Sequence, residues 1–454
     1  MTYPLVRRSI TYNRRLSDYK HRSNNYYYEI IILDNINFII NRKNNTLIRT
    51  HKNIKRPINH KLGILDINPR GFVLETNFSM NNNVRKIHKN IKITKKKLAL
   101  LLPGHNEELI IQASIQSAIA AGQPISDIYF VDDNSNDSSR AKAIKIIGTN
   151  QVLTVPRSGK AGAVNAAIIH FNMIERYNWV HIADADSAFG KDYFRIFRKA
   201  ITGTNAVVAV GFVQSLRGNW ISNYRALTYT LSQHVIRRAQ SWLGMISVFP
   251  GPITAFRTSI IPELDFLTKT IAEDFDITLQ VHRKKLGRVL FIPEAVNYTQ
   301  DPQTLNDFIK QTMRWQRGYF QGMKIHKIGT KLQKIDISIG YQMLEMLLFI
   351  LQIFVLVPIL IITTHNWNII PVLIVADMFV NSLIMFMTAI VLKRLSVLAS
   401  LPYFYVLRWL EIALFVRCFV EIFILDKFKS DIIGWSTEGR RVALSTLSLR
   451  DIAK

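Results

Sequence analysis

The chain has 454 residues, of which 48% are hydrophobic, and its 58 Lys and Arg against 32 Asp and Glu give a formal net charge of +26 at pH 7. This hydrophobic content can fill a sizeable core as well as membrane segments, whereas the positive charge suits an anionic membrane surface or a polyanionic partner without separating the two. The single cysteine, Cys418, excludes an internal disulfide, so the sequence gives no sign of an oxidising compartment.

Residues 1–97 are rich in Asn, Lys and Tyr and carry most of the charge, with 21 Lys and Arg against 5 Asp and Glu. Their best apolar run, residues 26–40, is interrupted by acidic and amide residues, so it predicts neither a signal peptide nor a spanning helix. We interpret residues 1–97 as a basic N-terminal extension that is β-rich or partly ordered. A new domain is expected to begin after the Lys95–Lys97 cluster.

From residue 98 onward, apolar runs and amphipathic segments alternate at spacings typical of βα units. The predicted strands are 98–103, 127–133, 152–155, 180–186 and 288–293, and the predicted helices are 107–121, 138–147, 162–174, 271–285 and 304–323. This alternation predicts an α/β domain, residues 98–330, with a doubly wound and mostly parallel sheet. Ligands of such sheets bind at the carboxyl ends of the strands.

One predicted strand ends on two carboxylates, Asp184 and Asp186. Side chains alternate along a strand, so both carboxylates are expected to point the same way and to share one Mg²⁺ or Mn²⁺ ion. An isolated Asp-x-Asp is weak evidence, because by itself it more often marks a solvated turn after a strand.

Three further polar loops follow predicted strands and are expected at the same edge of the sheet. They are Pro103–Glu107, Asp132–Ser135 and Ser158–Gly162. The second is also compatible with a plain turn and helix cap. The third lacks the glycine and the Ser or Thr of a P-loop, which leaves either a glycine turn or a positive diphosphate site made by Lys160 beside a helix N-terminus.

Two later helices carry candidate catalytic residues. Asp274 follows Glu273 in a first helical turn, where acidic residues also serve simply to complement the helix dipole. Gln311, Arg314 and Trp315 share one helical face, where they either pack or form a patch for a phosphate and a sugar ring.

Six motifs occur together, and their order and approximate spacing carry a family resemblance. They are Pro103-x-His-Asn-Glu107, Asp132-Asp133, Gly159-Lys-Ala-Gly-Ala-Val-Asn165, Asp184-Ala-Asp186, Glu273-Asp274 and Gln311-x-x-Arg314-Trp315. The set resembles family 2 glycosyltransferases, and most of all the membrane synthases of poly-N-acetylglucosamine, chitin, hyaluronan and cellulose. The resemblance covers residues 98 to about 323. Phe249–Phe256 resembles the acceptor-site segment of these enzymes, while Asn134 and Ala272 depart from the family pattern.

The resemblance implies a GT-A catalytic domain and a role for each matching residue. The nucleotide sugar would be bound by His105, Glu107, Asp133, Lys160 and Asp184. Mg²⁺ or Mn²⁺ would be held by Asp184 and Asp186, and the general base would be Asp274. The acceptor and the diphosphate would be bound by Glu273, Gln311, Arg314 and Trp315. The metal and Arg314 would neutralise the leaving UDP, and a single in-line displacement would invert the anomeric carbon.

Residues 331–425 form a predicted membrane region. Residues 344–364 and 369–392 are each long and apolar enough to span a bilayer. Residues 336–346 predict an amphipathic helix that lies under the catalytic domain, and residues 401–425 are either an interfacial helix or a third span. Lys and Arg flank the spans on the side of the catalytic domain and are absent from the connecting loop. This asymmetry predicts an integral membrane protein with its catalytic domain in the cytoplasm, followed by a basic cytoplasmic tail, residues 426–454.

Charged residues within the predicted membrane segments indicate a further partner. Asp377, Arg408, Glu411, Arg417 and Glu421 are expected to need neighbours that the chain itself is too short to supply. This predicts a homo-oligomer or a small membrane subunit, since two or three helices do not enclose a glycan channel. The alternative is an interfacial helix whose charged residues reach the headgroups.

Three functions fit these features. The leading one is transfer of a sugar from UDP-N-acetylglucosamine or UDP-glucose to a growing β-linked polysaccharide. The second is transfer of a single sugar to a lipid acceptor. The third, suggested by charge alone, is a nucleic-acid-binding or membrane-scaffolding protein, but charge does not account for the ordered acidic motifs, so we expect no nucleic-acid partner.

Overall fold

The computed structural model describes residues 96–267 and 270–427, together with the backbone of five short strands between residues 28 and 73. The chain divides into two units, Met1–Thr94 and Lys95–Lys454. The predicted catalytic and membrane regions both lie in the second unit. The predicted basic tail lies outside the described residues beyond Lys427.

The described strands of the first unit form two small antiparallel sheets. The strands are β1 (Tyr28–Leu33), β2 (Ile36–Asn41) and β3 (Thr46–Thr50) in one sheet, and β4 (Asp66–Asn68) and β5 (Gly71–Val73) in the other.

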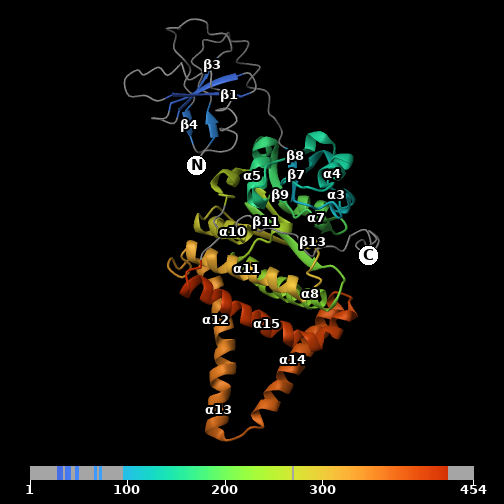
Figure 1. Ribbon diagram of the computed structural model, residues 1–454, viewed down its shortest axis with the longest axis vertical. Helices are drawn as coiled ribbons and strands as arrows, with labels where there is room; N and C mark the ends of the chain where they lie inside the picture. The colour runs from blue at the N-terminus through green and yellow to red at the C-terminus, as the bar shows by residue number, and fades with distance from the viewer. Residues whose placement is uncertain are drawn as a thin grey trace. The chain divides into compact units, whose positions relative to one another are not determined.

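The second unit is built on a mixed sheet of eight strands in the order β10-β13-β11-β12-β9-β6-β7-β8 (Figure 1). The strands are β6 (Lys96–Gly104), β7 (Ile128–Asp132), β8 (Val152–Thr154), β9 (Tyr177–Ile182), β10 (Ala188–Phe189), β11 (Val208–Ser215), β12 (Thr254–Arg257) and β13 (Val289–Thr299). Strands β6 to β9 are mutually parallel, while β12 and β10 run antiparallel to their neighbours. The predicted fold class, a mostly parallel GT-A-like sheet followed by C-terminal helices, is confirmed.

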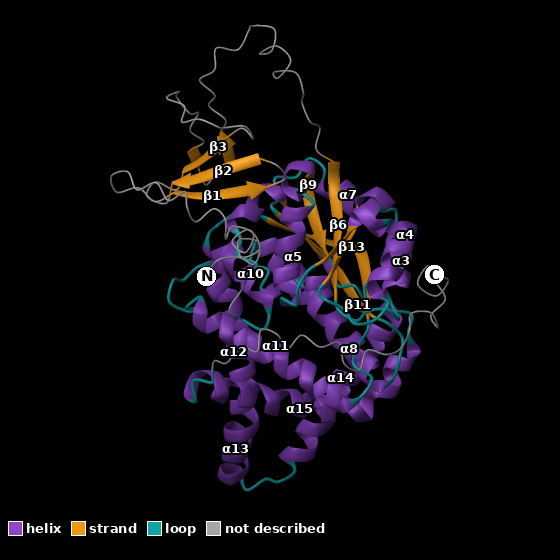
Figure 2. Cartoon of the chain, turned by 45° about the horizontal axis from the view of Figure 1, so that its top comes forward, coloured by secondary structure: helices purple, strands orange, loops and turns teal. Residues whose placement is uncertain are grey.

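Helices cover both faces of this sheet (Figure 2). They are α3 (Ile111–Ala120), α4 (Ser139–Ile147), α5 (Gly159–His170), α6 (Met173–Arg176), α7 (Tyr193–Ile201), α8 (Trp220–Leu231), α9 (Arg238–Leu243) and α10 (Glu273–Arg283). Helix α11 (Leu305–Ile325) packs against α10 instead of the sheet. Alternate residues of β6 enter different cores: Leu100 packs with α3, α4 and α7, whereas Leu101 packs with α5 and α10. Both faces are therefore apolar, and the strand ends remain for polar residues.

Strand β9 is shorter than predicted, which changes the argument for the Asp-x-Asp motif. The strand ends at Ile182, and the Ser187 N–H donates to the Asp184 carbonyl at 3.0 Å to close a turn. The prediction that strand alternation aligns Asp184 and Asp186 is therefore wrong. The Asp186 residue is buried, whereas the Asp184 side chain is 21% exposed.

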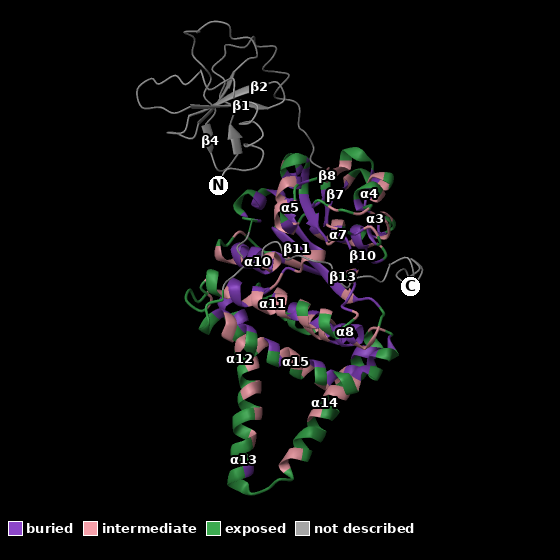
Figure 3. Cartoon of the chain, in the orientation of Figure 1, coloured by how far each residue is buried: buried purple, intermediate pink, exposed green. Residues whose placement is uncertain are grey.

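Two of the described helices are long and apolar enough to cross a membrane. The first runs from Lys334 to Thr364 as α12 (Lys334–Leu351), a π-helical turn and α13 (Val357–Thr364), and the second is α14 (Ile369–Val391). Both project from the folded unit with mostly exposed side chains (Figure 3). The residues of the predicted amphipathic helix, 336–346, lie in the first turns of α12, where Ile339 is buried and Ile337 is exposed, and they continue into the first span.

The segment that the sequence left ambiguous forms α15 (Leu401–Phe419) and a π-helical turn, Val420–Ile424. It lies against α8 and α11 (Figure 1), and its exposed face is largely apolar. That face includes Val406, Trp409, Val416 and Phe423. One face on protein and one apolar outer face favour the interfacial helix over a third span.

The chain itself supplies partners for the charged residues of this region. Arg408 lies 3.3 Å from Asp377, Glu411 lies 3.2 Å from an arginine of α8, and Glu421 pairs with Arg417 at 3.0 Å and with an arginine of α11 at 2.8 Å. The prediction that these residues need neighbours outside the chain is wrong. For Glu411 and Glu421 it failed because the arginines of α8 and α11 that pair with them are far away in the sequence.

Candidate active site

Lys160 joins two of the predicted site motifs. It lies in the first turn of α5, which begins at Gly159, and its Nζ is 2.6 Å from Asp184 Oδ1 and 3.0 Å from Glu273 Oε1. The ammonium group therefore connects the Asp-x-Asp turn after β9 with the first turn of α10. Burial alone would lower the pKa of Lys160, but the charges of Asp184 and Glu273 raise it above its usual value, so the ammonium stays protonated.

Gly251 lies directly over this ion pair. A Cβ atom at Gly251 would fall 2.5 Å from Lys160 Nζ and 3.6 Å from Asp184 Oδ1, so a side chain there would displace the lysine. The Phe249 N–H donates to Thr278 Oγ1 at 2.9 Å, which ties this segment to α10. The segment Phe249–Phe256, which resembles the acceptor-site segment of the family, thus lies over the predicted donor-binding residues Lys160 and Asp184.

Asp274 lies next to Glu273 in the first turn of α10. Burial, and then the charge of Glu273, raise its pKa to about 6, while Lys160, the Phe275 N–H and Arg314 act in the opposite direction. A carboxyl group with such a pKa is ionised at neutral pH and is more basic than an ordinary aspartate. These properties suit the predicted role of Asp274 as a general base.

Two glycines allow α11 to approach the first turns of α10 closely. A Cβ atom at Gly318 would fall 2.3 Å from Ala272 Cβ, and a Cβ atom at Gly322 would fall 2.7 Å from the Phe275 ring. The small side chain of Ala272, one of the departures from the family pattern, thus lies where α11 is nearest. Arg314, one turn before Gly318 on α11, interacts electrostatically with Asp274.

The predicted nucleotide-binding residues of the first loops form a second cluster. The fully buried Asp133 carboxylate accepts hydrogen bonds from the Ser158 and Gly159 N–H groups at 2.7 and 3.0 Å and pairs with Arg157 at 2.8 Å. His105 Nδ1 lies 2.9 Å from the Asp133 carbonyl oxygen. Asp133 therefore holds the loop that leads into Lys160.

The backbone of these loops explains two other observations. Asn134 adopts φ +59°, in the left-handed region that glycine and asparagine tolerate best, so this departure from the family pattern suits the backbone. Glu107 is buried, and its N–H donates a hydrogen bond to Ser139 Oγ, at the start of α4, at 2.7 Å.

The predicted cluster on α11 is divided between two neighbours. Whereas Arg314 interacts with Asp274, Gln311 and Trp315 both meet Arg225 of α8: the guanidinium lies 3.4 Å from Gln311 Oε1 and 4.8 Å from the Trp315 ring centroid. Arg225 was not predicted as a site residue, because a single arginine in a helix carries no local signal.

The carboxylates fit a divalent cation that is shared with substrate. Among residues 97–267 and 270–427, no three His, Cys, Asp or Glu side chains are grouped as a complete metal site. Asp184 and Asp186 lie in one turn and offer two carboxylates. Mg²⁺ commonly takes one or two carboxylates together with substrate phosphate oxygens, so this donor set fits a cation held jointly with a diphosphate.

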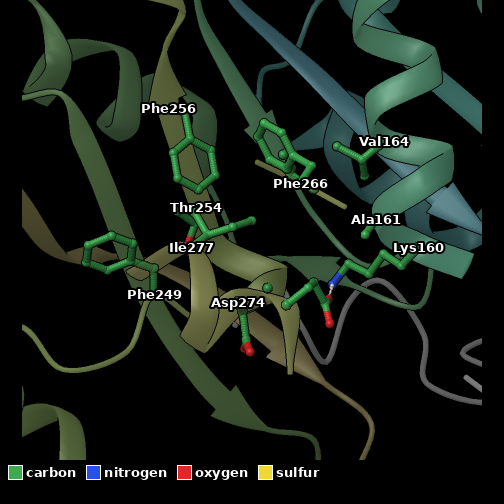
Figure 4. A pocket seen from close by; sticks show the side chains of 12 residues that line it. Lys160, Ala161, Val164, Phe249, Thr254, Phe256, Phe266, Asp274 and Ile277 are labelled. Carbon is green, nitrogen blue, oxygen red and sulfur yellow. Dashed lines mark ion pairs between the residues drawn. The ribbon is translucent and has the colours of Figure 1, made fainter. Parts of the chain in front are cut away.

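A cavity of about 30 Å³ lies beside the Lys160 ion pair. Figure 4 shows Lys160 and Asp274 at its edge and the rings of Phe249, Phe256 and Phe266 around it. The polar groups of the site thus lie against apolar side chains, which exclude water from one side of the ion pair. A buried base, a fixed cation and two adjacent carboxylates can bind a diphosphate and remove a proton from a hydroxyl group.

Comparisons with known proteins agree with this chemistry. Over 228 residues the chain is 25% identical to the poly-β-1,6-N-acetyl-D-glucosamine synthase of Staphylococcus aureus, which covers 49% of this chain and 54% of the relative. Over 259 residues it is 26% identical to the probable glycosyltransferase YdaM of Bacillus subtilis, covering 53% and 59%. The chain thus spans somewhat more than half the length of these curated relatives.

Distant likenesses also occur among solved structures. The mannosyltransferase PcManGT of Pyrobaculum calidifontis, in complex with GDP-Man and Mn²⁺, has a TM-score of 0.41 and 17% identity over 55% of this chain and 70% of its own. S. aureus TarS residues 1–349, in complex with UDP-GlcNAc, has a TM-score of 0.35 and 15% identity over 52% and 68%.

The family model for glycosyl transferase family group 2 matches residues 179–415, more than half of the chain. This range contains the Asp-x-Asp turn, the start of α10, α11 and most of α15. The chain therefore belongs to glycosyl transferase family group 2.

Proposed function

We propose that this glycosyltransferase is membrane-bound and transfers a sugar from a UDP-sugar to a growing β-linked glycan with inversion at the anomeric carbon. The observation that carries the proposal is the contact of Lys160 with both Asp184 and Glu273, which brings the predicted donor site within reach of Asp274. UDP-N-acetylglucosamine is the donor we expect ahead of UDP-glucose, in keeping with the name of the S. aureus relative.

Each residue has a task in a single displacement. Asp274 accepts the proton of the acceptor hydroxyl as its oxygen bonds to the anomeric carbon, and the bond to UDP breaks on the opposite side of that carbon. Lys160 and Arg314 neutralise the charge that develops on the leaving diphosphate. A divalent cation held by Asp184 and Asp186 would add Lewis-acid stabilisation of the same diphosphate. His105, Glu107 and Asp133 shape the loops that receive the nucleotide.

The acceptor is expected on the α11 side of Asp274. Trp315 is 36% exposed and offers a flat apolar surface for a sugar ring, while Gln311 adds a hydrogen-bonding amide. The helix that ends at Thr364 and α14 would cross the membrane, and the Lys and Arg at their catalytic-domain ends support a cytoplasmic catalytic domain.

The test is to reconstitute the full chain in lipid and to measure UDP release from a panel of UDP-sugars with Mg²⁺ or Mn²⁺. UDP release from one donor, lost in Asp274→Asn, is the expected result, and a ladder of products would distinguish polymer synthesis from the addition of one sugar to lipid. Absence of UDP release with every donor would refute the proposal.

A further inference from the structure

Arg225 is a buried cation between two aromatic rings. Its residue is 4% exposed, and its Cζ atom lies 4.4 Å from the ring centroid of Phe308 and 4.8 Å from that of Trp315. Both rings belong to the α11 region, whereas Arg225 comes from the middle of α8. The guanidinium over the Trp315 ring restricts the position of the indole, because a cation is attracted to the face of an aromatic ring.

Hydrogen bonds fix the same guanidinium to α11 and to α15. Its Nη2 donates to Thr312 Oγ1 at 3.0 Å and lies 3.4 Å from Gln311 Oε1, and its Nη1 donates to Glu411 Oε1 at 3.2 Å. Glu411 is held in turn: its Oε2 accepts from the Tyr224 hydroxyl at 2.6 Å, and its carbonyl accepts from Gln316 Nε2 at 3.1 Å. One guanidinium thus joins the side chains of Gln311 and Trp315 to the interfacial helix.

We propose that Arg225 is a positioning residue for the acceptor, and that Glu411 of α15 is the counter-ion that holds it in place. The inference rests on the proposed function, since Gln311 and Trp315 are the residues expected to bind the acceptor. Arg225 acts through them: it backs one side of the indole and restrains the amide, while the exposed part of Trp315 stays open to a sugar ring.

Stability alone does not account for this arrangement. The Arg225 side chain is buried and that of Glu411 is 26% exposed, so the pair loses much of its hydration, and a well-packed apolar pair of similar volume in a buried site is often as stable or more stable. An apolar pair would leave α8, α11 and α15 packed together, but it would not stack a planar cation on Trp315 or bind Gln311. This difference separates positioning from a structural role.

The experiment compares Arg225→Lys, Arg225→Met and Arg225→Met/Glu411→Leu in reconstituted full-length protein. UDP release gives KM for the donor and, with a β-linked N-acetylglucosamine tetrasaccharide as probe, KM for the acceptor; thermal melting reports folding. The matched control is Arg317→Met/Glu421→Leu, which removes the 2.8 Å ion pair between α11 and the π-helical turn that follows α15.

We expect the acceptor KM to rise at least 10-fold in all three Arg225 variants, with the donor KM within about 2-fold of wild type. In the control variant the acceptor KM should stay unchanged. Arg225→Lys keeps a charge beside Glu411, so it tests positioning even if the apolar variants fail to fold. An unchanged acceptor KM in Arg225→Lys would overturn this inference but not the proposed function. A wild-type acceptor KM in folded Arg225→Met/Glu411→Leu protein would do the same. Failure of the wild-type enzyme to release UDP would instead overturn the proposed function, and this inference with it.

Discussion

The close approach of α11 to Ala272 leads to a prediction for Gly318→Ala. The added Cβ would lie 2.3 Å from Ala272 Cβ and 2.9 Å from the Ala272 nitrogen. Carbon atoms in contact rest about 3.5–4.0 Å apart, so one of the two elements must move by more than about 1 Å. Overpacking of this kind costs about 1–3 kcal/mol, and the helix preference of alanine over glycine offsets roughly 1 kcal/mol. The net loss of unfolding free energy should be about 0–2 kcal/mol.

The effect on catalysis should be larger than the effect on stability. Ala272 immediately precedes Glu273 and Asp274, so the displacement is transmitted to the expected base, and a misplacement of about 1 Å can lower turnover roughly 100-fold. The assay is UDP release at saturating donor together with thermal melting. Gly340→Ala, in α12, is the control, because a Cβ there meets nothing within 4 Å and activity should be retained.

A second substitution tests the cause directly. Ala272→Gly in the Gly318→Ala background removes the 2.3 Å contact but leaves the 2.9 Å contact with the backbone nitrogen, so turnover should recover in part. Wild-type turnover in Gly318→Ala would refute the reasoning, because it would show that the start of α10 does not need its observed position.

Four further outcomes are expected. Asp274→Asn should keep nucleotide binding while turnover falls at least about 100-fold, and loss of UDP binding instead would move the residue to the donor pocket. Because burial raises the pKa of Asp274 to about 6, turnover should be lost as pH falls through about 6 instead of about 4. The stability that the protonated Asp274 contributes is fully present below its unfolded pKa of 3.8 and is lost as pH rises through 6. Asp274→Asn should therefore melt at a higher temperature than wild type at pH 7. Excess EDTA or Asp186→Ala should abolish UDP release, and full activity under either condition would exclude the metal. Gly251→Ala should displace Lys160 and raise donor KM more than acceptor KM, and an unchanged donor KM would argue against Lys160 as a donor contact.

Local patterns in the sequence were sufficient to predict the fold class and the family. Apolar runs alternating with amphipathic segments predicted the α/β sheet and its helices, because one face of each element must be buried whatever its neighbours are. The order of six short motifs predicted the glycosyltransferase family, and residues 344–364 and 369–392 both fall in helices long enough to span a membrane. The limits of elements were less predictable: β9 ends at Ile182, four residues short of Asp186, because the turn that follows is closed by a backbone hydrogen bond.

The contacts that shape the site depend on packing between distant segments, which no local pattern encodes. Lys160 meets Glu273 only because α5 and α10 lie on the same face of the sheet, and Arg225 meets Glu411, 186 residues later in the chain, only because α15 docks on α8 and α11. The same docking pairs Glu421, in the turn after α15, with Arg317 of α11. Periodicity specifies which face of a helix is buried, but the partner of a buried charge is set by how the helices pack, and this is why Arg225 carried no signal in the sequence.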